Sequence, residues 1–222
     1  MRIKSLLFLC FGFICLFATQ TVAVGFFSGN FGEYSIGFDP KEGIVLGYFE
    51  SSSIGNGTEN NPQFICEFNI YGRLNRDEYG KIEKEQDEVE ISAWYPGSNK
   101  YINGLIKTYK KNGTDYIKVK LDEEPDGAMN AYPGVATEWN DFEFTKKGDW
   151  IGVNGVEAKK AYFYDKENSP KSRKAYLVRG DKVYLHNNVY GSEKVLVKYI
   201  GSNGKITRGW MKRADLSIPV SD

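Results

Sequence analysis

Hydrophobic residues recur along the first two thirds of the chain in short stretches with a period of two. In residues 63–71, for example, Phe64, Phe68 and Ile70 fall on one side of the alternation and Glu67 falls on the other. Successive side chains of a β-strand point to opposite faces, so this spacing predicts strands rather than helices. The stretches that we expect to form strands are residues 31–38, 44–49, 63–71, 88–95, 101–109, 115–121, 141–144 and 150–156.

Turn residues separate these stretches at short intervals. Residues 39–43 and 110–114 carry glycine together with aspartate, proline or asparagine, and Pro96-Gly97 separates two further strands. Eight short strands with frequent turns and no convincing helix are typical of an antiparallel barrel or sandwich. We therefore expect residues 24–157 to form one all-β domain of this kind.

One stretch of this domain, residues 122–134, has neither a strand nor a helix period. It begins with acidic residues and continues with small, apolar and turn residues. An irregular segment of this length inside a small domain is often functional. The residues that we expect to contact a partner here are Asp126, Met129, Asn130 and Tyr132.

The last quarter of the chain contains a second set of short strands. We expect strands at residues 161–164, 176–178, 183–185 and 194–200, and a last strand that ends at residues 209–211. Residues 179–182 should form a turn, because Gly180 can adopt a positive φ and Asp181 can hydrogen-bond its own backbone.

The same region contains two spaced motifs. These are Tyr-Leu-x-x-Gly-Asp-x-Val at residues 176–183 and Gly-Trp-x-x-x-x-Asp-Leu at residues 209–216, and the aromatic strand 161–164 precedes both. Together they resemble a bacterial SH3-type domain. The resemblance implies that residues 158–222 form a small SH3-like barrel that binds peptides in an aromatic groove and does not catalyse a reaction. The groove residues that we expect from it are Tyr162, Tyr164 and Tyr190.

The first 23 residues have the composition of a secretory signal peptide. Arg2 and Lys4 precede an apolar run at residues 6–17, which is too short to cross a bilayer comfortably, and polar residues follow this run at once. Small residues suit cleavage near Ala23. We expect a periplasmic or secreted protein that does not insert into the membrane after cleavage, and the alternative is a membrane anchor.

The formal net charge of the chain is zero, but the charges are not evenly distributed. Residues 24–157 contain 13 Lys and Arg against 23 Asp and Glu, whereas residues 158–222 contain 14 against 6. Either the two domains dock on each other, or the basic domain faces an anionic partner such as cell-wall polymer or an acidic protein. Ordinary solvated surfaces are the third interpretation.

The sequence offers few groups for catalysis or metal binding. His186 is the single histidine, and Cys66 is the single cysteine after the leader, so an ordinary zinc site is not expected. Residues 122–126 are acidic but lack the spacing of a calcium-binding motif. We expect no catalytic residue, no cofactor and no metal, although the carboxylates of residues 77–90 leave a glycosidase site open.

These features favour an exported, non-catalytic binding protein of the bacterial envelope. The expected partner is a peptidoglycan peptide or an envelope protein, not a nucleic acid. The alternative is a periplasmic inhibitor or immunity protein that caps a wall-degrading enzyme or a toxin, since charge segregation suits the capping of a charged enzyme. An enzyme with an unrecognised carboxylate site is a third hypothesis.

Overall fold

The computed structural model describes residues 25–53, 58, 63–82, 86–125, 136–187 and 190–219. The predicted leader lies outside these residues. The described part contains strands and one short 3-10 helix, η1 (Arg213–Asp215), which confirms the all-β prediction. None of its helical structure has the length and apolar character needed to cross a bilayer.

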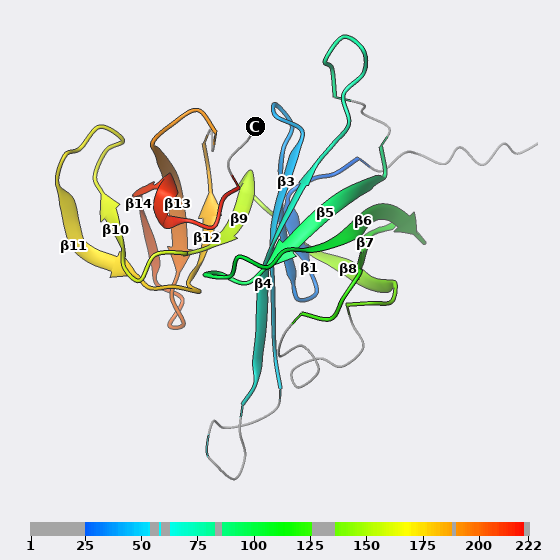
Figure 1. The fold of residues 1–222 in the computed structure, drawn as a ribbon, viewed down its shortest axis with the longest axis horizontal. Helices are drawn as coiled ribbons and strands as arrows, with labels where there is room; N and C mark the ends of the chain where they lie inside the picture. The colour runs from blue at the N-terminus through cyan, green and yellow to red at the C-terminus, as the bar shows by residue number, and fades with distance from the viewer. Residues whose placement is uncertain are drawn as a thin grey trace, which may run out of the picture.

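The first eight strands form a closed antiparallel barrel, in which each strand pairs with the next and β8 pairs with β1 (Figure 1). Of the two predicted architectures, the structure therefore shows the barrel. The strands are β1 (Gly29–Phe31), β2 (Tyr34–Asp39), β3 (Ile44–Ser52), β4 (Ile65–Arg73), β5 (Glu88–Trp94), β6 (Ile102–Lys111), β7 (Thr114–Leu121) and β8 (Asn140–Lys147).

The barrel differs from the prediction at both of its ends. Residues 31–38 were expected to form one strand, but the chain reverses at Gly32, whose φ is 54°, and forms β1 and β2. Residues 150–156 were expected to finish this domain, but they leave the barrel. The two differences cancel, so the number of strands remains eight.

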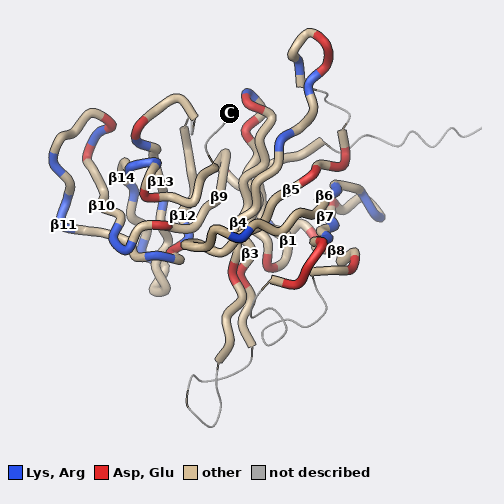
Figure 2. Tube along the Cα trace, in the orientation of Figure 1, with Lys and Arg blue, Asp and Glu red and all other residues tan. Residues whose placement is uncertain are grey.

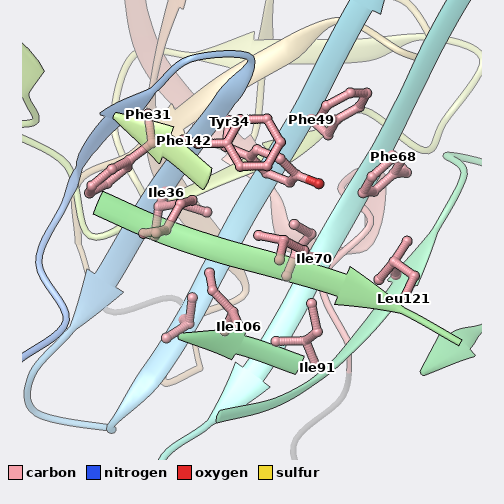
Figure 3. Packing of buried hydrophobic residues seen from close by; sticks show 14 of the residues in the cluster. Phe31, Tyr34, Ile36, Phe49, Phe68, Ile70, Ile91, Ile106, Leu121 and Phe142 are labelled. Carbon is pink, nitrogen blue, oxygen red and sulfur yellow. The ribbon is translucent and has the colours of Figure 1, made fainter. Parts of the chain in front are cut away.

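The barrel interior is packed with the side chains that the period-two pattern places on one face of each strand. Large aromatic rings fill one part of it (Figure 3). Tyr34 meets Phe142 with ring centroids 4.6 Å apart, and Phe49 stacks on Phe68 at 4.7 Å. Cys66 is fully buried in the same core as a free thiol.

The remaining strands form a second sheet in the order β11-β10-β14-β13-β12-β9. They are β9 (Gly152–Gly155), β10 (Ala161–Tyr164), β11 (Ser172–Leu177), β12 (Lys182–Leu185), β13 (Lys194–Ile200) and β14 (Ile206–Lys212). The predicted turn at residues 179–182 is confirmed. Gly180 has a φ of 87°, and Asp181 Oδ2 accepts the backbone N–H of Val178 at 2.7 Å.

Strand β3 connects the barrel to the second sheet because both of its faces are buried. Val45 and Phe49 point into the barrel core, whereas Ile44 and Leu46 belong to the core of the second sheet. Tyr48 joins a third buried cluster together with Tyr184 of β12. Strand β3 therefore contributes side chains to the cores of both halves of the molecule.

Close backbone packing and buried hydrogen bonds fix this junction. A Cβ atom at Gly37 of β2 would lie 2.2 Å from the Cα atom of Gly152, so the two strands approach more closely than side chains would allow. The backbone N–H of Gly155 donates to Asn69 Oδ1 at 2.7 Å, and Trp150 Nε1 donates to the Ile36 carbonyl at 2.9 Å. Buried polar groups that are paired in this way hold one relative orientation.

Candidate functional site

A cleft of about 400 Å³ opens where the barrel meets the second sheet, and we call it the junction cleft. Its barrel side is formed by β3 and β4, and its other side by the turn before β12 and by the end of β13. The side chains that dominate its chemistry are Glu50, Glu67, Asp181, Lys182, Tyr184 and Tyr199.

Three carboxylates converge in the junction cleft from distant parts of the chain. The β3–β4 register places Glu50 directly opposite Glu67, an arrangement of like charges that costs stability. Asp181 adds a third carboxylate from the turn that carries Gly180, which itself lies against Glu67: a Cβ atom at position 180 would be 2.7 Å from Glu67 Oε1.

The cations of the junction cleft balance this charge only in part. Lys182 Nζ donates to Glu50 Oε2 at 2.7 Å. Arg179 also lines the cleft, but its Nε donates to the backbone carbonyl of Glu157 at 2.8 Å. Glu67 and Asp181 therefore face the cleft with no lysine or arginine in ion-pair contact among the described residues.

The surroundings of Glu67 disfavour the ionised form of its carboxyl group. Burial raises the pKa of its carboxyl group above the usual value. The Tyr48 hydroxyl lowers this pKa, and the nearby Glu50 and Asp181 carboxylates raise it. The positive charge of Lys182 lowers this pKa by a smaller amount. Tyr48 is buried and donates its hydroxyl to the Gly180 carbonyl at 2.9 Å, and burial also raises its pKa. A cationic group that entered the cleft would relieve this repulsion.

Charge is segregated in the folded molecule as the sequence indicated. Figure 2 shows many acidic residues along the barrel, whose β6–β7 hairpin also carries lysines, and basic residues along β11 and the neighbouring turns. Apolar packing of Ile44 and Leu46, together with the buried hydrogen bonds described above, holds the junction, while the Lys182–Glu50 ion pair lies at its solvent edge.

The tyrosines expected to form an aromatic groove do not come together as a set. Tyr162 is half-buried and faces Tyr176 with ring centroids 5.6 Å apart. Tyr164 is buried beneath Lys194, whose Nζ lies 4.8 Å from the ring centroid. Tyr190 packs against the core of the second sheet, close to Tyr71. The predicted loop residues Asp126, Met129, Asn130 and Tyr132 lie outside the described residues.

Cys66 and His186, the single cysteine after the leader and the single histidine, lie in different halves of the molecule. Cys66 is inside the barrel, where its Sγ is 3.6 Å from the Tyr95 hydroxyl and burial raises its pKa, which favours the unreactive thiol. His186 follows β12, and burial lowers its pKa. Within the described ranges, no group of three or more His, Cys, Asp or Glu residues could hold a metal ion.

Sequence reasoning did not select Glu50, Glu67 or Asp181. Lys182 and Glu50 are 132 positions apart, and no local pattern shows that such residues will meet. The usable signal was the Gly-Asp pair at positions 180 and 181, because the turn that it forms is the element that docks on β4.

Comparison with known proteins finds no family model, no curated protein and no solved structure that matches the chain. A functional assignment therefore depends on the chemistry of this chain's own residues.

Proposed function

We propose that the protein is an exported, non-catalytic binding protein of the bacterial envelope, and that its junction cleft recognises a cell-wall peptide through a basic group. The observation that carries this proposal is the convergence of Glu50, Glu67 and Asp181 around a single ion-paired lysine. Wall peptides contain diamino acids, whose side-chain ammonium group would complement this excess of carboxylates.

The cleft offers carboxylates for the ammonium group of such a side chain and an aromatic ring for its aliphatic part. The ammonium group would form charge-assisted hydrogen bonds with Glu67 and Asp181, which are stronger than hydrogen bonds between neutral groups. Tyr199 would flank the aliphatic part of the side chain, since tyrosine combines an apolar ring with a polar hydroxyl. Because a bound cation favours the ionised carboxylate, binding should also release a proton from Glu67 near its raised pKa.

We propose further that the second sheet is an SH3-type domain and that the leader directs export, with cleavage near Ala23. The support for this proposal is that the residues of the two motifs lie in a turn at residues 179–182 and in a strand at residues 206–212, preceded by the aromatic strand 161–164. In this chain the Gly-Asp turn of the motif contacts the barrel, which supports a site made jointly by both halves.

The test is calorimetric titration of the mature chain with a soluble stem peptide that contains a free diamino-acid amine. Glu50→Gln with Glu67→Gln should weaken binding about tenfold or more. Glu143→Gln is the matched control, because this exposed carboxylate lies on β8, away from the junction cleft. Failure of the peptide to bind, or equal binding of the peptide with its amine acetylated, would contradict the proposal.

A second candidate function, inhibition of a wall-degrading enzyme, is favoured by one observation. Strands β3 and β4 extend together beyond the rest of the barrel (Figure 1), and the exposed fractions of Phe64 and Ile65 on this arm are 42% and 58%. A projecting arm with apolar side chains can enter the cleft of an enzyme. Inhibition of a lysozyme-type hydrolase that is lost in Phe64→Ser with Ile65→Ser would support this function, and inhibition that survives both substitutions would contradict it.

A further inference from the structure

A second depression, with a volume of about 530 Å³, lies on the outer face of β4, β5 and β6, and we call it the β4–β6 hollow. Its floor consists of outward side chains in two rows across the three strands. The pairing register places Tyr71, Ser92 and Asn103 in one row and Glu90 with Leu105 in the next. Arg73 and Asp122 complete the lining.

Two glycines lie side by side across β5 in this part of the barrel wall. Gly72 and Gly104 flank Ile91 in register and face the interior. A Cβ atom at Gly104 would lie 2.3 Å from the Lys120 carbonyl oxygen, and one at Gly72 would lie 2.8 Å from Val89 Cγ1. Glycine in a strand often marks a close approach of another backbone or of a ligand. Both glycines are among the residues that line the hollow.

Within the hollow, Arg73 Nε donates to the Tyr71 hydroxyl at 3.2 Å, whereas four other polar side chains have no partner among the described residues. Further round the barrel, the polar side chains are engaged in the ion pairs Glu88–Lys107, Lys110–Asp115 and Lys118–Asp141. In the described part of the chain, no hydrogen bond or ion pair engages the side chains of Ser92, Asn103, Glu90 and Asp122. Four neighbouring polar groups therefore remain available to a ligand.

We propose that the β4–β6 hollow binds a short, uncharged oligosaccharide. A sugar hydroxyl both donates and accepts hydrogen bonds. Neighbouring hydroxyls therefore match a carboxylate such as Glu90, which only accepts, and an amide such as Asn103, which does both. The half-buried side chains of Tyr71 and Leu105 offer apolar surface for the C–H groups of a sugar ring.

The charge and size of the hollow narrow the ligand further. Two carboxylates against the single guanidinium of Arg73 disfavour an anionic glycan. Two carboxylates are also too few for calcium, which takes roughly six to eight oxygen ligands. Small-molecule sites usually have volumes of about 300–1,000 Å³, a range that includes this hollow. The backbone carbonyl of Asn103 accepts a hydrogen bond from the Asp122 N–H at 2.8 Å, and this bond helps to fix the position of Asn103 in the hollow.

The experiment is a titration of the ¹⁵N-labelled mature chain with tetramers of N-acetylglucosamine and of glucose, followed by NMR. With at least one tetramer we expect a saturable shift of two kinds of signal. These are the backbone amide signals of Gly72 and Gly104 and the side-chain amide signal of Asn103. Asn103→Ala with Glu90→Gln should weaken this binding about tenfold. Glu88→Gln should leave it unchanged, because Glu88 lies on the same strand and the same face but outside the hollow.

Several outcomes would overturn the proposal. These are the absence of shifts with both tetramers at about 10 mM, shifts confined to other residues, and binding that survives the double substitution in a variant with a folded spectrum. Shifts of the same amides by a lysine-containing peptide, but not by a tetramer, would show that the ligand class is wrong. The hollow and the junction cleft share no lining residue, so either site can fail without the other.

Discussion

The barrel closes on itself, whereas the second sheet is completed by its neighbours. All hydrogen-bonded edges of the barrel are paired through the β8–β1 contact, and the hydrophobic residues of its core that the structure describes lie between positions 26 and 144. The core of the second sheet includes Ile44 and Leu46 from the barrel. Its edge strand β9 is covered by the C-terminal segment, where the Ser217 N–H donates to the Gly155 carbonyl. A region that a sequence motif delimits is thus not necessarily a region that folds alone.

The largest expected effect concerns this difference directly. Residues 148–222 produced alone should not fold cooperatively, because Val183 and Leu185 would lose the barrel side chains that cover them. A chain of about 75 residues has little apolar surface to spare, as domains of about 60 residues bury only roughly 60% of their unfolded surface. The measurement is amide NMR dispersion together with urea-induced unfolding.

Residues 24–147 serve as the counterpart in the same experiment. They should fold, since the closed barrel retains its core, but with reduced stability because Ile44, Leu46 and Tyr48 would be exposed to solvent. A cooperative unfolding transition of the isolated second sheet would refute the dependence, and the two halves would then be ordinary independent domains.

Two single substitutions should distinguish the two cores within the intact chain, with a smaller effect on stability than the truncations have. Leu46→Ala and Ile70→Ala each remove a side chain that is at most 1% exposed, from adjacent strands of the same barrel. Each should lower the free energy of unfolding by about 2–5 kcal/mol, measured by urea denaturation. Leu46 belongs to the second core and Ile70 to the first.

Amide hydrogen exchange distinguishes the two substitutions. Leu46→Ala should accelerate exchange chiefly in β12 and β13, and Ile70→Ala chiefly in β4 and β5, because each cavity loosens the core that it lies in. If Leu46→Ala accelerated exchange only in the barrel, β3 would not be a structural part of the second core.

The comparison also shows which features the sequence could predict. Alternation predicted most of the strands, and Gly180 with Asp181 predicted a turn, because both signals depend on neighbouring residues. The sharing of β3 was also visible as the uninterrupted apolar run at residues 44–49, which is typical of a strand buried on both faces.

The candidate sites were beyond this reasoning for a physical reason. Glu50 and Glu67 meet Asp181 only after the turn before β12 has docked on β4, a contact between residues more than a hundred positions apart. The β4–β6 hollow is lined by Gly72 and Gly104, whose alignment across β5 follows from the strand register. Local patterns predict elements, whereas pairing and docking decide which polar side chains converge.

The smallest expected effect is that of Glu67→Gln on stability. It tests whether the carboxylates of the junction cleft outnumber the cations that could neutralise them. Burial raises the pKa of Glu67, so the folded state holds this proton more tightly than the unfolded state does. Ionisation of Glu67 therefore costs stability as the pH rises above its unfolded value of about 4.3. Glu67→Gln should consequently raise the free energy of unfolding at pH 7, by about 0.5 kcal/mol or less because solvent screens the half-exposed carboxyl group.

The gain should disappear below about pH 4, where the wild-type carboxyl group is protonated in both states. Urea denaturation at pH 7 and at low pH measures the difference, with the exposed Glu90→Gln as the control on β5. Destabilisation by Glu67→Gln at pH 7 would mean that the carboxylate is already satisfied by Tyr48 and Lys182, and the cleft would then have no demand for a cation. Stabilisation combined with loss of peptide binding is the opposite result, and it is the pattern expected of a residue retained for binding at a cost to stability.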